Sequence, residues 1–177
     1  MNVKLETALD NVESTYGELV EVANGMLQPL FAPINDLVSK INSTVNALSI
    51  EQIRDYILQL QLKAFEISET KEKAALKAEL AETLQKEKFA ISFNNLEGSA
   101  AVKDKLATVE NAPEVVAEAL YNLVSNLLKT KLDQLHRLVD ALKSILMSRM
   151  QETKFMNVGS NAEIPATVGQ AYIGPKF

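Results

Sequence analysis

Apolar residues recur three and four positions apart along most of this chain, and that spacing constrains its fold more than any other feature. A period near 3.6 residues lines one face of an α-helix, whereas a half-buried β-strand needs a period of two. Only 6% of the 177 residues are aromatic and 6 are glycine, which is unlike the composition of β-sandwiches and barrels. The sequence therefore predicts an all-α protein.

The first 48 residues are predicted to form a pair of helices. One covers residues 4–24 and stops at Asn24-Gly25, where glycine can adopt a left-handed conformation. Pro29 and Pro33 then bracket a short apolar turn, and Pro33 fits the first turn of a second helix that ends near Leu48.

Residues 49–156 are predicted to form a long antiparallel helical hairpin with coiled-coil character. Ser49 and Gln52 have the spacing of a capping box and begin a helix that extends to about residue 92. Its pattern indicates one narrow apolar seam, with charged residues on the other faces between Lys63 and Lys88. Gly98 suits a turn, a short helical piece covers 102–109, and Asn111 and Pro113 suit the start of a helix over 112–153.

The last helix has an apolar face too wide for a single neighbour. In a heptad assignment, Leu128, Leu135 and Leu142 occupy position a and Leu138 and Ile145 occupy d, while further apolar residues fall at e. We expect these five residues to form a packing and oligomer seam. The rest of the face would be covered by the N-terminal helices or by another copy of the chain.

The segment 157–177 loses the helical period and contains three glycines and two prolines. One interpretation is a loosely ordered chain end. The other is an extended arm that contacts a neighbouring subunit through Ile164, Tyr172, Ile173 and Phe177.

The charge of the chain is unevenly distributed. Residues 1–62 carry 3 basic and 8 acidic side chains, whereas the last helix has a modest basic stripe. We predict candidate phosphate contacts at Lys129, Lys131, Arg137, Lys143 and Arg149, with Lys86 and Lys88 as additional contacts near the aromatic residues Phe89 and Phe93. A solvated helix face is the alternative, because nucleic-acid binders usually have a stronger basic bias.

Residue content argues against catalysis and bound metal. With no cysteine and one histidine, thiolate metal sites and cysteine nucleophiles are excluded, and no Glu-x-x-His motif accompanies the glutamates of the long helix. His136, between Asp133 and Asp140, fits a surface histidine, and nucleotide-binding glycine motifs are absent. We predict no enzyme activity, cofactor, small-molecule substrate, membrane span or signal peptide, and a cytoplasmic location.

Residues 51–154 resemble a loose group of small helical proteins encoded by tailed phages. The resemblance lies in the charged helix, the turn in NNLEGSAAVKDKLA and the leucine-rich helix ending in LKTKLDQLHRLVDALKSILMSRMQETK. It implies a non-enzymatic, oligomeric accessory of phage recombination or replication that binds single-stranded DNA weakly or binds other proteins. The alternative is a structural assembly protein of the virion, whose C-terminal arm contacts a neighbouring subunit.

Overall fold

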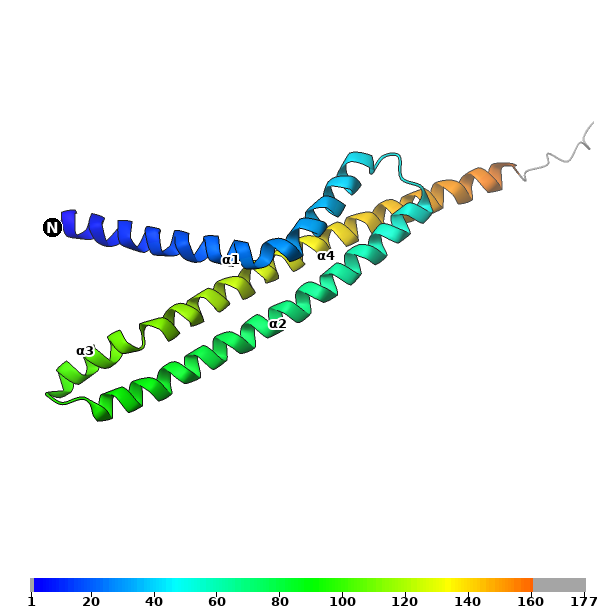
Figure 1. Cartoon of the computed structure of the whole chain (residues 1–177). Coiled ribbons are helices and arrows are strands. Elements are labelled where there is room, and N and C mark those ends of the chain that lie inside the picture. The colour runs from blue at the N-terminus through cyan, green and yellow to red at the C-terminus, as the bar shows by residue number, and fades with distance from the viewer. Residues whose placement is uncertain (1, 161–177) are drawn as a thin grey trace, which may run out of the picture.

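A computed structural model describes residues 2–160 of the chain, with side chains over residues 12–154. This part consists of four helices without strands: α1 (Asn2–Thr44), α2 (Ile50–Asn95), α3 (Ala100–Glu110) and α4 (Ala112–Ser160). The prediction of an all-α protein is thus confirmed. Figure 1 shows α2 and α4 side by side along the length of the molecule, with α1 lying across α4.

Three side-chain contacts show that α2 and α4 run in opposite directions. Arg54 of α2 lies 4.0 Å from the sulfur of Met150, near one end of the pair. Lys77 lies 5.2 Å from the ring centroid of Tyr121, and Lys88 pairs with Glu114 near the other end. Residue numbers thus rise along α2 as they fall along α4, and the turn and short helix α3 connect the two (Figure 1).

Helix α1 runs in the same direction as α4. Lys131 Nζ donates to Asn35 Oδ1 at 2.5 Å, and Arg149 donates to the carbonyl oxygens of Val45 and Asn46 at 3.2 and 3.0 Å. The hydrogen bonds of Arg149 lie at the end of the molecule where the loop after α1 leads into α2. Two cationic side chains of α4 therefore hold α1 in place.

The predicted pair of N-terminal helices is wrong, because α1 is continuous through Gly25, Pro29 and Pro33. Neither proline can donate the usual helical hydrogen bond, and an interior proline costs about 3 kcal/mol. Burial of Leu27 and Ile34 on the two sides of Pro29 and Pro33 offsets that cost. Figure 1 shows α1 bent in its middle part, as interior prolines cause, and its N-terminal part diverges from α3 and α4.

The predicted cap of α2 and the predicted turn before α3 are confirmed. Ser49 and Gln52 form the capping box at the start of α2, and Gly98 has a φ of 122° in the turn before α3. Asn111 differs from the prediction, because its side chain donates to the carbonyl of Ala107 at 2.7 Å and so closes α3. Its main-chain carbonyl accepts from Glu114 N at the start of α4.

The last helix is longer than the sequence predicts. The period is lost from Asn157, yet α4 continues to Ser160. Gly159 costs about 1 kcal/mol in a helix and Asn157 and Ser160 cost less, whereas the next proline, which would break the helix, is Pro165. The predicted arm residues Ile164, Tyr172, Ile173 and Phe177 lie outside the described residues.

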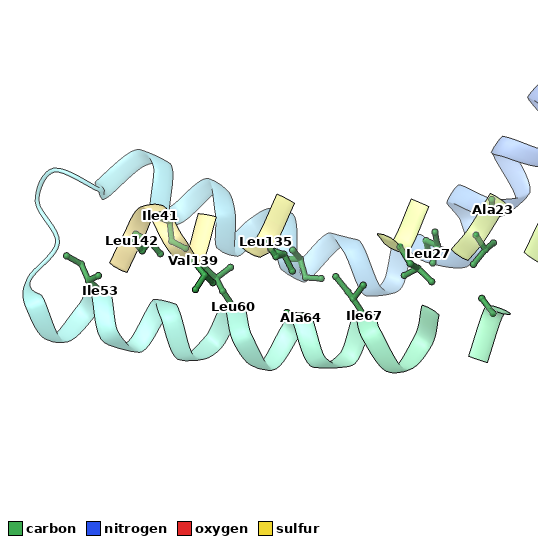
Figure 2. Close-up of a cluster of buried hydrophobic side chains, with 14 of the residues drawn as sticks. Ala23, Leu27, Ile41, Ile53, Leu60, Ala64, Ile67, Leu135, Val139 and Leu142 are labelled. Carbon is green, nitrogen blue, oxygen red and sulfur yellow. The ribbon is translucent and has the colours of Figure 1, made fainter. Parts of the chain in front are cut away.

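The core lies where α1, α2 and α4 meet, and its buried residues recur every seven positions (Figure 2). Figure 2 shows Ile41 of α1 near Leu142 of α4 and Ile53 of α2. A seven-residue repeat keeps the buried residues of long helices aligned over several turns. The members of this repeat are Leu27, Ile34, Ile41 and Leu48, then Ile53, Leu60, Ile67, Ala74 and Ala81, and finally Leu128, Leu135 and Leu142.

Candidate functional site

The cations predicted to contact nucleic acid do not form one surface. On α4, Lys129 and Arg137 are exposed, and Lys143 is exposed and paired with Asp140 at 3.3 Å. Arg149 is bound to the carbonyls at the end of α1, and Lys131 is half-buried between α1 and α4. Of the five predicted contacts on α4, two therefore have structural roles.

Lys131 lies in a partly desolvated environment. Its Nζ lies 5.4 Å from the ring centroid of Phe31 and donates to Asn35. Burial lowers the pKa of Lys131, because a desolvated ammonium is less stable than a hydrated one. The side chain is thus committed to the α1–α4 contact.

Lys86 and Lys88 lie on α2 near the turn, far from most of the α4 cations. Lys86 donates to Glu82 at 2.5 Å, and this hydrogen bond raises the pKa of Lys86. Lys88 pairs with Glu114 of α4, which lowers the pKa of that carboxyl. Both lysines therefore have carboxylate partners within the chain.

The aromatic residues near Lys86 and Lys88 also contact side chains of the same chain. Phe89 and Phe93 stack on each other with ring centroids 6.1 Å apart and an interplanar angle of 23°. Both are half-buried. Their free ring surface is smaller than the sequence suggests.

The residues predicted to form an oligomer seam lie inside the chain's own core. Leu128, Leu135 and Leu142 are buried, while Leu138 and Ile145 are partly buried against the same cluster. Helices α1 and α2 of the same chain provide the packing partners. These residues are thus part of the folded core of the chain itself.

His136 lies beside a shallow groove of about 530 Å³ between α2 and α4. The groove also contains Phe65, Ser68, Asp140 and Lys143. The imidazole is exposed, as a surface histidine would be. Over the described residues, no group of three or more His, Asp or Glu side chains is placed to hold a metal ion.

The surface that sequence reasoning missed is a second apolar face on α2. Between residues 58 and 84 of this helix, six large apolar side chains are exposed, and several of them border the grooves that α2 forms with α1 and α4: Leu58, Leu62, Phe65, Leu76, Leu80 and Leu84. We name this set the outer α2 stripe. Phe65 is 72% exposed and Leu76 is 64% exposed, so neighbouring helices of the chain cover little of them. The prediction of one narrow apolar seam on this helix is therefore wrong.

The stripe was concealed by its charged neighbours. Glu69 and Lys73 lie in the middle of it and form an ion pair at 2.6 Å, and the hydrogen bond from Lys73 lowers the pKa of Glu69. The signal was nevertheless present, because the leucines at 58, 62, 76, 80 and 84 are spaced for one helix face. Apolar patches on exposed faces commonly mark interaction sites.

Comparison of the chain with known protein families, with characterised proteins and with solved structures finds no match. Across residues 2–160, none of the helices contains a stretch long and apolar enough to cross a membrane.

Proposed function

We propose that the chain is a non-enzymatic helical protein that assembles into homo-oligomers and serves as a structural or interaction component. The outer α2 stripe is the observation that supports this proposal most directly. Fully burying an exposed leucine is worth about 1.5–3 kcal/mol, and the stripe residues are 41–72% exposed, so burying what remains exposed of all six would favour binding of another helix. Coiled-coil packing is the expected mode, given the seven-residue repeats of the core.

The experiment is a measurement of molar mass for the full chain by sedimentation equilibrium over a wide concentration range. We expect the average mass to rise above that of the 19.5 kDa monomer as concentration increases. A mass that stays at the monomer value at every concentration would contradict self-assembly.

For phage-encoded proteins of the kind this chain resembles, such a component would belong either to the virion or to DNA metabolism. The assembly role requires only protein contacts, which the outer α2 stripe can supply. It is therefore the role that the surface of the described residues supports best.

Binding of single-stranded DNA is the second candidate, and the exposure of Lys129 and Arg137 on α4 favours it. Within residues 12–154, neither side chain takes part in an ion pair. The acidic residues Asp133 and Asp140 lie nearby in sequence, which limits the positive potential of the face.

The test of this candidate is a titration with a fluorescent single-stranded oligonucleotide at low and high salt. If Lys129 and Arg137 contact phosphates, replacing both with alanine weakens binding and reduces its salt dependence. Lys131 and Arg149 should be left unchanged, because their loss would also disturb the α1–α4 contact. Unaltered binding by the Lys129→Ala/Arg137→Ala variant would remove this site.

A further inference from the structure

Four leucines of the outer α2 stripe and the charged pair at its centre are placed symmetrically along the helix. Its centre lies between Glu69 and Lys73, which are equally distant from the midpoint of the stripe. Around that midpoint, Leu62 mirrors Leu80 and Leu58 mirrors Leu84. Phe65 and Leu76 are not part of this symmetry, because the mirrored positions are Lys77 and Glu66, and the exposed Ile91 lies beyond it. In a twofold interface, residue i of one copy contacts residue j of the other and j contacts i, and the two leucine pairs fit that rule.

We propose that the outer α2 stripe is a twofold dimer interface, in which the α2 helices of two copies pack antiparallel about a point between Glu69 and Lys73. This inference rests on the proposed self-assembly and specifies its surface. Leu62 of each copy would lie against Leu80 of the other, and Leu58 against Leu84. The apolar pairs would thus flank a charged centre on both sides.

The charged centre is complementary to itself in this arrangement. The antiparallel register places Glu69 of each copy opposite Lys73 of the other, so two reciprocal pairs form between the copies. In a parallel arrangement in register, Glu69 would face Glu69 and Lys73 would face Lys73, which is unfavourable. Charge therefore selects the antiparallel orientation that the apolar mirror also requires.

The size of the stripe sets the expected strength of the dimer. Residues 58–84 span roughly 39 Å of helix at about 1.5 Å per residue. A single-helix strip of this length falls at the low end of specific interface areas, where weak complexes are found. We therefore expect a dissociation constant in about the micromolar range.

Cysteine crosslinking tests the orientation directly, because the natural chain has no cysteine. Antiparallel packing predicts that the Leu62→Cys/Leu80→Cys double variant forms a covalent dimer under mild oxidation. Each single variant should crosslink poorly, because identical positions lie far apart. Efficient crosslinking of each single variant, without an advantage for the double variant, would overturn the antiparallel arrangement.

Charge reversal tests the register. Glu69→Lys places lysine opposite Lys73 of the other copy and should raise the dissociation constant by about tenfold or more. Glu69→Lys/Lys73→Glu restores both reciprocal pairs and should restore dimerisation. All of these residues are exposed, so circular dichroism should show native helix content in each variant. Equal dissociation constants for the native chain and both variants would overturn the register.

Removal of the leucines separates this inference from the proposed function. Leu62→Ser/Leu80→Ser should leave the fold intact and give a monomer, since these side chains are 59% and 58% exposed. Met147→Ser is the matched control, because Met147 is 68% exposed and lies on α4 outside the stripe. An oligomer that survives Leu62→Ser/Leu80→Ser would overturn the interface alone. A native chain that is always monomeric would contradict self-assembly itself.

Discussion

At the scale of single residues, the cations of α4 differ in their surroundings. Lys129 is exposed, whereas Lys131, two positions along the helix, is half-buried against Phe31 and Asn35. Their spacing places them on different faces, and only the face of Lys131 meets α1. A basic stripe read from sequence thus combines side chains that bind solvent with side chains that hold helices together.

We expect Lys131→Ala to lower the free energy of unfolding by about 1–2 kcal/mol, since it removes a hydrogen bond from a charged donor and the packing of the lysine stem. Lys129→Ala is the control and should change stability by less than about 0.5 kcal/mol. Urea unfolding monitored by circular dichroism gives both values. Equal effects of the two substitutions would mean that Lys131 does not hold α1.

Glu114 provides a pH-dependent contact between the ends of α2 and α4. Its hydrogen bond with Lys88 lowers the pKa of the folded carboxyl below its ordinary value. A group whose pKa is lower in the folded state stabilises the fold above its unfolded pKa, and that contribution is lost as pH falls through the folded pKa. The contribution should therefore be present at neutral pH and lost on acidification below the ordinary glutamate range.

The expected outcome is that Glu114→Gln is less stable than the native chain at pH 7 and that the difference shrinks as the pH falls below the ordinary glutamate pKa. Thermal unfolding of both proteins across this pH range measures it. A Glu87→Gln variant serves as a control, since Glu87 is exposed on α2. A Glu114→Gln difference that does not depend on pH would show that the ion pair is not its cause.

At the scale of helices, the sequence predicted correctly that the chain is helical and where most helices begin. It did not predict that α1 is one continuous helix. Ser49, Gln52, Gly98 and Pro113 marked the helix starts and the turn correctly, because capping and turn chemistry are local. The prolines of α1 led to the wrong prediction of a break between two helices. Whether a helix continues through a proline depends on how its residues pack against distant parts of the chain. The outer α2 stripe was missed for a different reason, since charged residues such as Glu69 and Lys73 lie among its apolar residues.

The prolines of α1 allow this explanation to be tested. We expect Pro29→Ala to raise the free energy of unfolding by up to about 3 kcal/mol, because alanine restores a helical hydrogen bond and removes the clash with the preceding turn. Chemical denaturation measures the change, with Ser39→Ala at an exposed α1 position as a control for helix propensity alone. Lower stability for Pro29→Ala would show that the bend in α1 is needed for packing on α4.

At the scale of the whole molecule, the described residues form an elongated three-helix body whose thickness is uneven. Helices α1, α2 and α4 share a core of leucine and isoleucine near the loop after α1. Toward the turn at Gly98, the buried α2 residues are Ala74, Ala78 and Ala81, and the N-terminal part of α1 diverges from the pair (Figure 1). The outer α2 stripe spans both regions, so a second copy would stabilise the thin end as well as the thick one.

Truncation of the chain after Ser160 distinguishes two explanations of assembly, one through the outer α2 stripe and one through the C-terminal arm. If the outer α2 stripe forms the dimer, a chain truncated after Ser160 should have the same dissociation constant as the full chain, since residues 58–84 are unchanged. If the arm predicted from the sequence of 157–177 makes the contact, removing its residues after Ser160 should instead reduce the average mass at equal concentration. Sedimentation equilibrium gives the average molar mass of the full and truncated chains, each with and without Leu62→Ser/Leu80→Ser. Comparing the four masses shows whether the stripe, the arm or both are needed for assembly. A truncated chain that is monomeric despite an intact stripe would show that the stripe alone is insufficient.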